Sequence, residues 1–160
     1  MLLGLLRRFK TVEFKAPVKG KAVSLAAVPD PVFAAKILGD GLAIEPREGI
    51  IYAPVAGVVD CLFPTKHAIG IQTREGLKVI IHIGIDTVNL KGDGFENLVR
   101  VNQAVKAGDQ LMKFDIALLQ EKAKSAIIPV IITNMDRVAA IRFQYGEVDV
   151  HHTMMRVRLK

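Results

Sequence analysis

The chain has 160 residues, 51% of them hydrophobic and 24% charged, a composition that excludes a disordered chain and has room for one core. Its single cysteine excludes a disulfide framework within the chain and a cysteine-rich zinc module. Residues 1–21 carry six basic residues and one acidic residue, and so account for most of the net charge of +6. The remainder is nearly neutral, which argues against a nucleic-acid partner. We expect a cytoplasmic protein with one folded domain over residues 15–160.

Residues 1–14 are expected to form a basic, flexible tail. In its first ten residues a short apolar stretch comes first and basic residues follow, as in a short amphipathic segment that makes weak contact with anionic lipid at the inner face of the membrane. The alternative is a loose tail or a segment packed on the edge of the domain.

Short apolar runs bounded by turn residues predict strands along the rest of the chain. The fold class expected from them is all-β, mainly an antiparallel β-sandwich or barrel-sandwich hybrid with a few short helices. Cys61 lies in one such run and is expected in the core. The predicted strands cover residues 22–25, 41–44, 50–52, 57–62, 68–72, 78–83, 110–114, 128–133, 147–150 and 155–159.

Four segments carry helical signals. Asp30 followed by Pro31 predicts a capped turn or two over residues 31–38. Asp115 caps the strongest candidate, residues 116–125, which are rich in helix formers. We expect further short helices over residues 95–99 and 134–141.

The most informative residues for chemistry are two histidines. His82 lies within an apolar run, and on a strand it shares one face with Ile80 and Gly84. His67 precedes this run by about one hairpin, and a turn at Glu75 and Gly76 would pair the two strands and bring the histidines together. Paired imidazoles indicate a metal site, an acid–base pair or a phosphoryl acceptor with a helper.

Residues 76–88, GLKVIIHIGIDTV, closely resemble the active-site signature of the glucose-type enzyme IIA domains of the bacterial phosphoenolpyruvate-dependent sugar phosphotransferase system. The similarity extends over residues 30–160. It includes residues 39–44, 53–57, 65–68, 90–95, 118–125 and 134–136.

The resemblance implies a phosphotransferase component that works as a carrier. His82 would accept a phosphoryl group at Nε2 from a histidine-containing phosphocarrier protein and pass it to the enzyme IIB domain of a sugar permease. His67 would donate a hydrogen bond to the phosphoryl group, Thr65 would orient His67, and the Gly84 carbonyl would hold His82. No cofactor or metal is required.

The resemblance also implies a surface for the partners. Asp86 and Asp30 would face an arginine of the phosphocarrier, although Asp30 is equally explained as a helix cap. Around the histidines the family presents an apolar ring that docks both partners, here Val32, Phe33, Ile37, Leu38, Phe63, Ile80 and Val88.

Two alternatives stay open. The first is a regulatory switch, in which phosphorylation only changes binding to permeases or kinases. The second is a zinc hydrolase of related fold, which would need a third ligand beside the two histidines. Incidental capture of Zn²⁺ by His67 and His82 is compatible with each reading.

Overall fold

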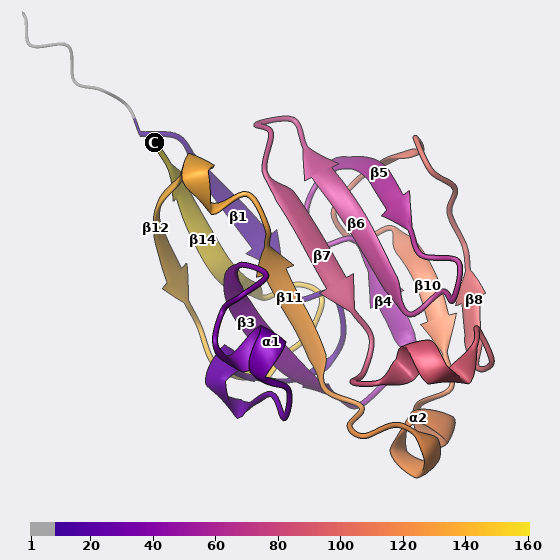
Figure 1. The fold of residues 1–160 in the computed structure, drawn as a ribbon. Coiled ribbons are helices and arrows are strands. Elements are labelled where there is room, and N and C mark those ends of the chain that lie inside the picture. The colour runs from indigo at the N-terminus through magenta and orange to yellow at the C-terminus, as the bar shows by residue number, and fades with distance from the viewer. Residues whose placement is uncertain (1–8) are drawn as a thin grey trace, which may run out of the picture.

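An eight-stranded antiparallel sheet is the largest element in the computed structural model, which describes residues 9–160 (Figure 1). Its strands, in spatial order, are β13 (Gly146–Val148), β2 (Gly20–Ser24), β3 (Asp40–Pro46), β11 (Ile128–Ile132), β7 (Lys78–His82), β6 (Ala68–Thr73), β5 (Gly57–Leu62) and β9 (Ala104–Val105).

Two three-stranded antiparallel sheets complete the β structure. One has the order β1 (Thr11–Lys15), β14 (Thr153–Leu159), β12 (Val138–Phe143), and the other β4 (Ile50–Tyr52), β10 (Gln110–Phe114), β8 (Phe95–Asn97). All three sheets contribute to a single large core. The expected all-β, antiparallel fold is therefore confirmed.

Helices are short and lie at the ends of strands. The α-helices are α1 (Pro31–Ala34) and α2 (Ile116–Lys122), and the 3₁₀ helices are η1 (Leu25–Ala27), η2 (Thr87–Leu90) and η3 (Met135–Arg137). Both predicted caps are present, because Asp30 accepts a hydrogen bond from the Val32 N–H at 2.9 Å and Asp115 from the Leu118 N–H at 3.0 Å. Among residues 9–160, no helix has the length and apolar character needed to cross a bilayer.

The two faces of the central strands bury different clusters. On β7, Val79 and Ile81 enter the large core, whereas Ile80 packs on the opposite face against a second cluster formed by Leu25, Val28, Phe33, Ala43, Ile85, Ile127 and Ile131. This second cluster exists because η1 and α1 cover that face of the sheet. His82, two residues beyond Ile80, lies on the same covered face.

Two predicted helices are wrong. Residues 95–99 contain β8, because Phe95 and Asn97 pair with Phe114 and Met112 of β10. Residues 134–141 contain only η3 before the chain enters β12. Runs this short suit either a helix or a strand, and pairing with a neighbouring strand decides between them.

Cys61 is exposed, contrary to the prediction that it lies in the core. The inward alternation of β5 runs through Val59, and the register with β6 shifts between Val59 and Cys61. This irregularity reverses the phase of the alternation, so that Cys61 points outward.

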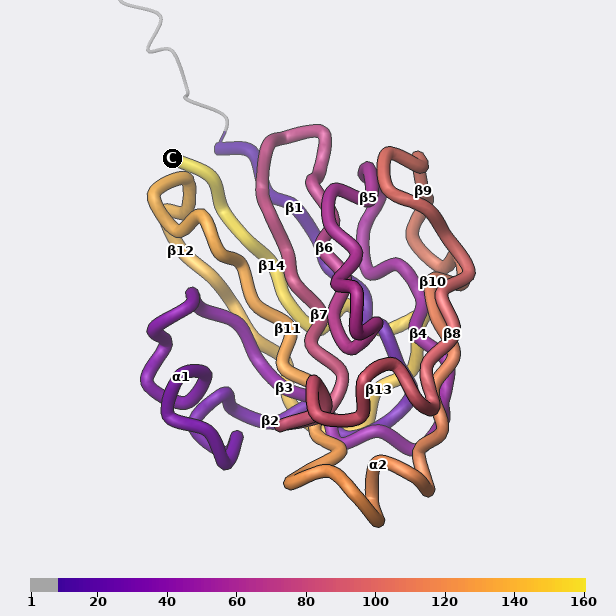
Figure 2. Tube along the Cα trace, turned by 45° about the vertical axis from the view of Figure 1, so that its right-hand side comes forward, coloured from indigo at the N-terminus to yellow at the C-terminus, as the bar shows by residue number. Residues whose placement is uncertain are grey.

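The folded body begins before residue 15. Thr11–Lys15 forms β1, which pairs with β14 (Figure 2). The β1 side chains Val12 and Phe14 are buried. The expected tail boundary at residue 14 is therefore corrected, since residues 11–14 belong to a sheet. The predicted membrane contact depends mainly on residues 1–8, which lie outside the described residues.

Candidate functional site

His82 ends β7 on the face that α1 covers. The Phe33 ring of α1 lies with its centroid 5.0 Å from that of His82, tilted by 58°. Phe33 is itself buried in the second cluster, so it forms a wall beside the imidazole. His82 remains half-buried.

His67 is brought to His82 by the β6–β7 hairpin. A turn closed by the Lys66 N–H, which donates to the Phe63 carbonyl at 2.8 Å, delivers His67 to the start of β6. Ala68 pairs with His82, and the Ile83 N–H donates to the His67 carbonyl at 2.7 Å. The imidazole centroids lie 4.9 Å apart at an interplanar angle of 77°, so the expected pairing of the histidines is confirmed.

Hydrogen bonds at Nδ1 orient both rings. His82 Nδ1 lies 2.7 Å from the Gly84 carbonyl oxygen, which can only accept, so Nδ1 carries the proton and Nε2 of the neutral ring has a free lone pair. His67 Nδ1 lies 2.5 Å from Thr65 Oγ1. When the Thr65 hydroxyl donates to this nitrogen, His67 presents Nε2–H as a donor. The pair then offers one nucleophilic nitrogen and one hydrogen-bond donor.

Gly84 is required where it stands. Its φ of +78° suits glycine, and a Cβ there would lie 2.5 Å from Thr87 Cγ2 and 3.0 Å from the Ser125 carbonyl oxygen. The close packing holds the carbonyl that binds His82. A substitution would move the acceptor away from Nδ1.

Thr87 and Ser125 support this turn, although the sequence pattern predicted a role for neither. Thr87 is buried and its hydroxyl donates to the Ile83 carbonyl at 2.6 Å. The Ser125 carbonyl accepts from the Ile85 N–H at 2.8 Å. Thr87 lies within the GIDT segment and could have been singled out there, whereas Ser125 comes from a distant loop that only the fold brings close.

Both histidines are held in the neutral form. The pKa of His82 is lowered to about 4, mainly by burial and also by the positive charge that His67 can carry, against the opposing effects of the Gly84 carbonyl, Asp30 and Asp86. Burial also lowers the pKa of His67. At neutral pH the His82 lone pair is therefore available without prior loss of a proton.

The two predicted acidic residues flank the histidines in different ways. Asp30 is half-buried and caps α1, so the helix-cap explanation is confirmed. Asp86 is exposed, has a left-handed φ of 61° before η2, and makes no capping hydrogen bond. Both carboxylates favour the charged form of His82 and so act to raise its pKa.

The predicted apolar ring is largely exposed. Its members Val32, Ile37, Leu38 and Val88 are half of the eight large hydrophobic side chains that residues 9–160 leave exposed, and Ile37 is 69% exposed. Phe63 and Ile80 are partly buried, with the Phe63 ring 5.4 Å from that of His67. Phe33 differs, because at 5% exposed it supports His82 instead of offering surface.

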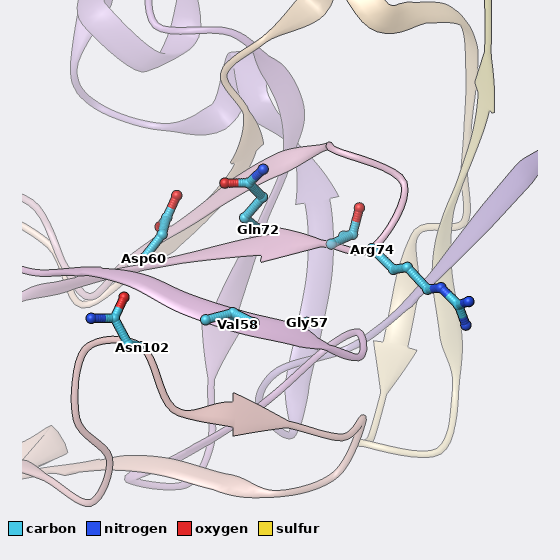
Figure 3. A pocket seen from close by; sticks show the side chains of 7 residues that line it. Gly57, Val58, Asp60, Gln72, Arg74 and Asn102 are labelled. Atoms are coloured by element: carbon cyan, nitrogen blue, oxygen red, sulfur yellow. The ribbon is translucent and has the colours of Figure 1, made fainter.

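A separate hollow of about 430 Å³ lies at the far end of β6 (Figure 3). Its floor is formed by β5 and β6, and the Arg74 side chain extends away from Gln72. It contains no histidine, cysteine or serine. Its lining residues are Gly57, Val58, Asp60, Gln72, Thr73, Arg74 and Asn102. The chemistry of the described residues therefore favours the histidine pair as the functional site.

Comparison with known proteins agrees with this choice. Residues 12–138 match the family model for the phosphoenolpyruvate-dependent sugar phosphotransferase system, EIIA 1. The chain belongs to this family. The resemblance noted in the signature is thereby confirmed, and so is the assignment as a phosphotransferase component of the sugar phosphotransferase system.

Relatives and a solved structure support the assignment over nearly the whole chain. The glucose-specific EIIA component of Bacillus cereus is 47% identical over 145 residues, which cover 91% of this chain and 88% of that protein. The corresponding Staphylococcus aureus protein is 48% identical over 132 residues, 82% of this chain and 80% of the relative. The glucose permease IIA structure from Mycoplasma capricolum superposes with a TM-score of 0.85 at 39% identity, covering 92% and 96% of the two chains.

The zinc-hydrolase alternative lacks a ligand set in the part of the chain that the structure describes. No group of three or more His, Cys, Asp or Glu side chains is arranged there to hold a metal ion. A catalytic zinc site typically uses three protein ligands. The EIIA 1 site is therefore better described as two imidazoles with distinct roles.

Proposed function

We propose that His82 Nε2 is the phosphoryl acceptor of this EIIA component. The observation that carries the proposal is the 2.7 Å hydrogen bond from His82 Nδ1 to the Gly84 carbonyl, which leaves Nε2 unprotonated beside His67. An EIIA component works with the histidine-containing phosphocarrier protein as donor and the IIB domain of a sugar permease as acceptor.

The phosphoryl transfer to His82 requires no proton transfer. The N–P bond of the donor phosphohistidine breaks as His82 Nε2 forms a bond to phosphorus, and the donor imidazole leaves with its electron pair. His82 keeps its Nδ1 proton, so its ring becomes positively charged in the phosphorylated form. The Gly84 carbonyl stabilises that charge directly, and Asp30 and Asp86 stabilise it through space.

His67 is assigned to the phosphoryl oxygens. Its Nε2–H can donate to them once Thr65 holds Nδ1, and this interaction strengthens as charge builds on the transferring group. The same contact works in both directions of transfer. Thr65 acts through His67 and is a positioning residue.

The exposed part of the apolar ring supports docking of both partners on the same surface. Val32, Ile37, Leu38 and Val88 gather on the helices α1 and η2 and the turn after α1, which flank the histidine pair. Apolar side chains at the centre of an interface would exclude water from the phosphohistidine during transfer. Asp86, exposed beside them, supplies a carboxylate for an arginine of the phosphocarrier.

The relatives' names support glucose as the sugar served by this relay. The phosphorylated form at the same surface would also change binding to regulated permeases or kinases. This second role uses the same residue and does not compete with phosphoryl transfer.

The test is phosphorylation by phosphoenolpyruvate, enzyme I and the phosphocarrier protein, followed by addition of a IIB domain. Wild type is compared with His82→Gln, His67→Gln and the exposed control His152→Gln. We expect wild type and His152→Gln to gain one acid-labile, base-stable phosphoryl group and His82→Gln to gain none. His67→Gln should still accept the group but pass it on about 100-fold more slowly.

Circular dichroism of each variant confirms folding. Phosphorylation of a folded His82→Gln would overturn the assignment of the acceptor. Unchanged onward transfer by His67→Gln would remove its proposed role and leave that of His82 intact.

A further inference from the structure

Three arginines share the outer face of the sheet formed by β1, β14 and β12. Arg142 of β12 pairs directly with Arg156 of β14, and Arg158 pairs with Ala140 on one side and Thr11 on the other. All three arginines are exposed. Together Thr11, Ala140, Arg142, Arg156 and Arg158 line a hollow of about 490 Å³, here called the Arg pocket.

The charges of the Arg pocket are only partly compensated. Glu13 accepts a hydrogen bond from Arg156 Nε at 3.1 Å, and the Arg158 guanidinium lies over the Phe9 ring at 5.0 Å from its centroid. Arg142 has no carboxylate partner among residues 9–160. Like charges placed directly opposite across an antiparallel pair are destabilising, and the Glu13 carboxylate offsets the repulsion between Arg142 and Arg156 only in part, because it pairs with Arg156 and not with Arg142.

The shape of the Arg pocket suits a discrete anion. Ala140 and Thr11 are small and flank Arg158 on the neighbouring strands, which leaves the hollow between the longer side chains. Guanidinium groups bind phosphoryl oxygens through pairs of parallel N–H donors, and several such groups around one hollow match several adjacent phosphoryl charges. The Glu13 carboxylate accepts a hydrogen bond from Arg156 and holds that guanidinium group in place.

We propose that the Arg pocket binds a soluble compound with adjacent phosphoryl groups, of the organic diphosphate or polyphosphate class. The site lies on a different sheet from the histidine pair and is independent of the phosphoryl relay. A flat anionic membrane is a poorer match, because membrane-binding clusters contain about four to eight basic residues, and the Arg pocket has three with a carboxylate among them.

The test is calorimetric titration of the full chain with inorganic pyrophosphate at low ionic strength, alongside sedimentation with phosphatidylglycerol–phosphatidylcholine vesicles. The variants are Arg142→Gln and Arg158→Gln, which remove charge, and Ala140→Leu, which fills the hollow and leaves the charge unchanged. Arg100→Gln removes an exposed charge elsewhere and is the matched control. Phosphoryl acceptance at His82 reports that each variant is folded.

We expect pyrophosphate binding that weakens at least about tenfold in Arg142→Gln, Arg158→Gln and Ala140→Leu and is unchanged in Arg100→Gln. Pyrophosphate binding that is weakened equally by Arg100→Gln would overturn the proposal, and so would binding that Ala140→Leu leaves unchanged. Either result would mean that pyrophosphate is attracted only by the general positive charge of the protein. Binding of vesicles with no binding of pyrophosphate would also overturn it and assign the face to a membrane.

Discussion

The histidine pair and the Arg pocket differ in solvent exposure and in charge. His82 stands beside buried Phe33 and is held neutral, with its pKa lowered to about 4. Arg142 and Arg158 project from a sheet into solvent and carry positively charged guanidinium groups. The difference follows from chemistry, because a nucleophile needs a free lone pair, whereas reversible capture of an anion needs a lasting positive charge. The fold places the nucleophile on a sheet face that is covered by α1, and it places the anion-binding arginines on a sheet face that is open to solvent.

We expect the largest effect from removing the Phe33 ring, which covers the sheet face that carries His82. Phe33→Ala should lower the free energy of unfolding by about 4 kcal/mol, because a buried aromatic ring is lost from the second cluster. It should also raise the pKa of His82 toward 6.5, since burial is the main cause of its depression. Denaturant unfolding measures the first effect, and NMR titration of the imidazole measures the second.

Phe143→Ala is the matched control for Phe33→Ala. Phe143 stacks on Tyr145, with ring centroids 6.0 Å apart, and packs against the large core, whereas Phe33 belongs to the second cluster. Its loss should leave the pKa of His82 unchanged. An unaltered His82 pKa in Phe33→Ala would show that the ring does not keep water from the imidazole.

Protonation of His82 at low pH should lower the free energy of unfolding by nearly as much as Phe33→Ala does. Unfolded histidine has a pKa near 6.5 and folded His82 has one of about 4, so the unfolded state binds more protons between these pH values. The free energy of unfolding contributed by His82 is complete above pH 6.5 and falls as the pH drops toward 4, by about 3 kcal/mol in total.

The measurement compares denaturant unfolding of wild type and His82→Gln from pH 8 to about 4. Glutamine does not titrate, so the difference in unfolding free energy should be constant above pH 6.5 and should shift in favour of the variant below it. His67 titrates in both proteins, and its contribution largely cancels. A difference that stays constant over the whole range would contradict a buried, neutral His82.

The smallest effect is expected on the open face. Arg142→Gln should raise the free energy of unfolding by about 0.5 kcal/mol at low salt, because it removes the like-charge pair with Arg156. The gain should vanish at about 1 M salt, where the Debye length is about 3 Å. A loss of stability at low salt would mean that Arg142 makes a favourable contact within the fold.

The histidine site could be predicted because it is local. His67 and His82 lie on one hairpin, so alternation and a turn sufficed to place them together before any tertiary contact was known. The strands β4, β5 and β10 could be predicted with correct bounds for the same reason. The Gly84 carbonyl contact follows from a resemblance, and its close packing against Ser125 required the fold.

The Arg pocket could not be predicted in this way. Thr11, Arg142 and Arg158 come from the two ends of the chain, and only the register of β1, β14 and β12 brings them side by side. The strand β1 itself carries a readable alternation, in which Val12 and Phe14 point inward and Thr11 and Glu13 outward. The high positive charge of the first 21 residues favoured the prediction of a flexible tail, so the alternation of β1 was not interpreted as a strand.

The pairing of β1 with β14 has a consequence for the order of the chain. The Leu159 N–H donates to the Lys10 carbonyl at 2.9 Å, so the two ends of the described chain meet at one edge. A short linker could join them, and new ends could be opened at the exposed turn of Gly108, where an added Cβ would meet no other part of the fold within 4 Å. Such a circular permutant would keep His67 and His82 on one uninterrupted hairpin, because the hairpin and the Gly84 turn that follows it lie between residues 63 and 87.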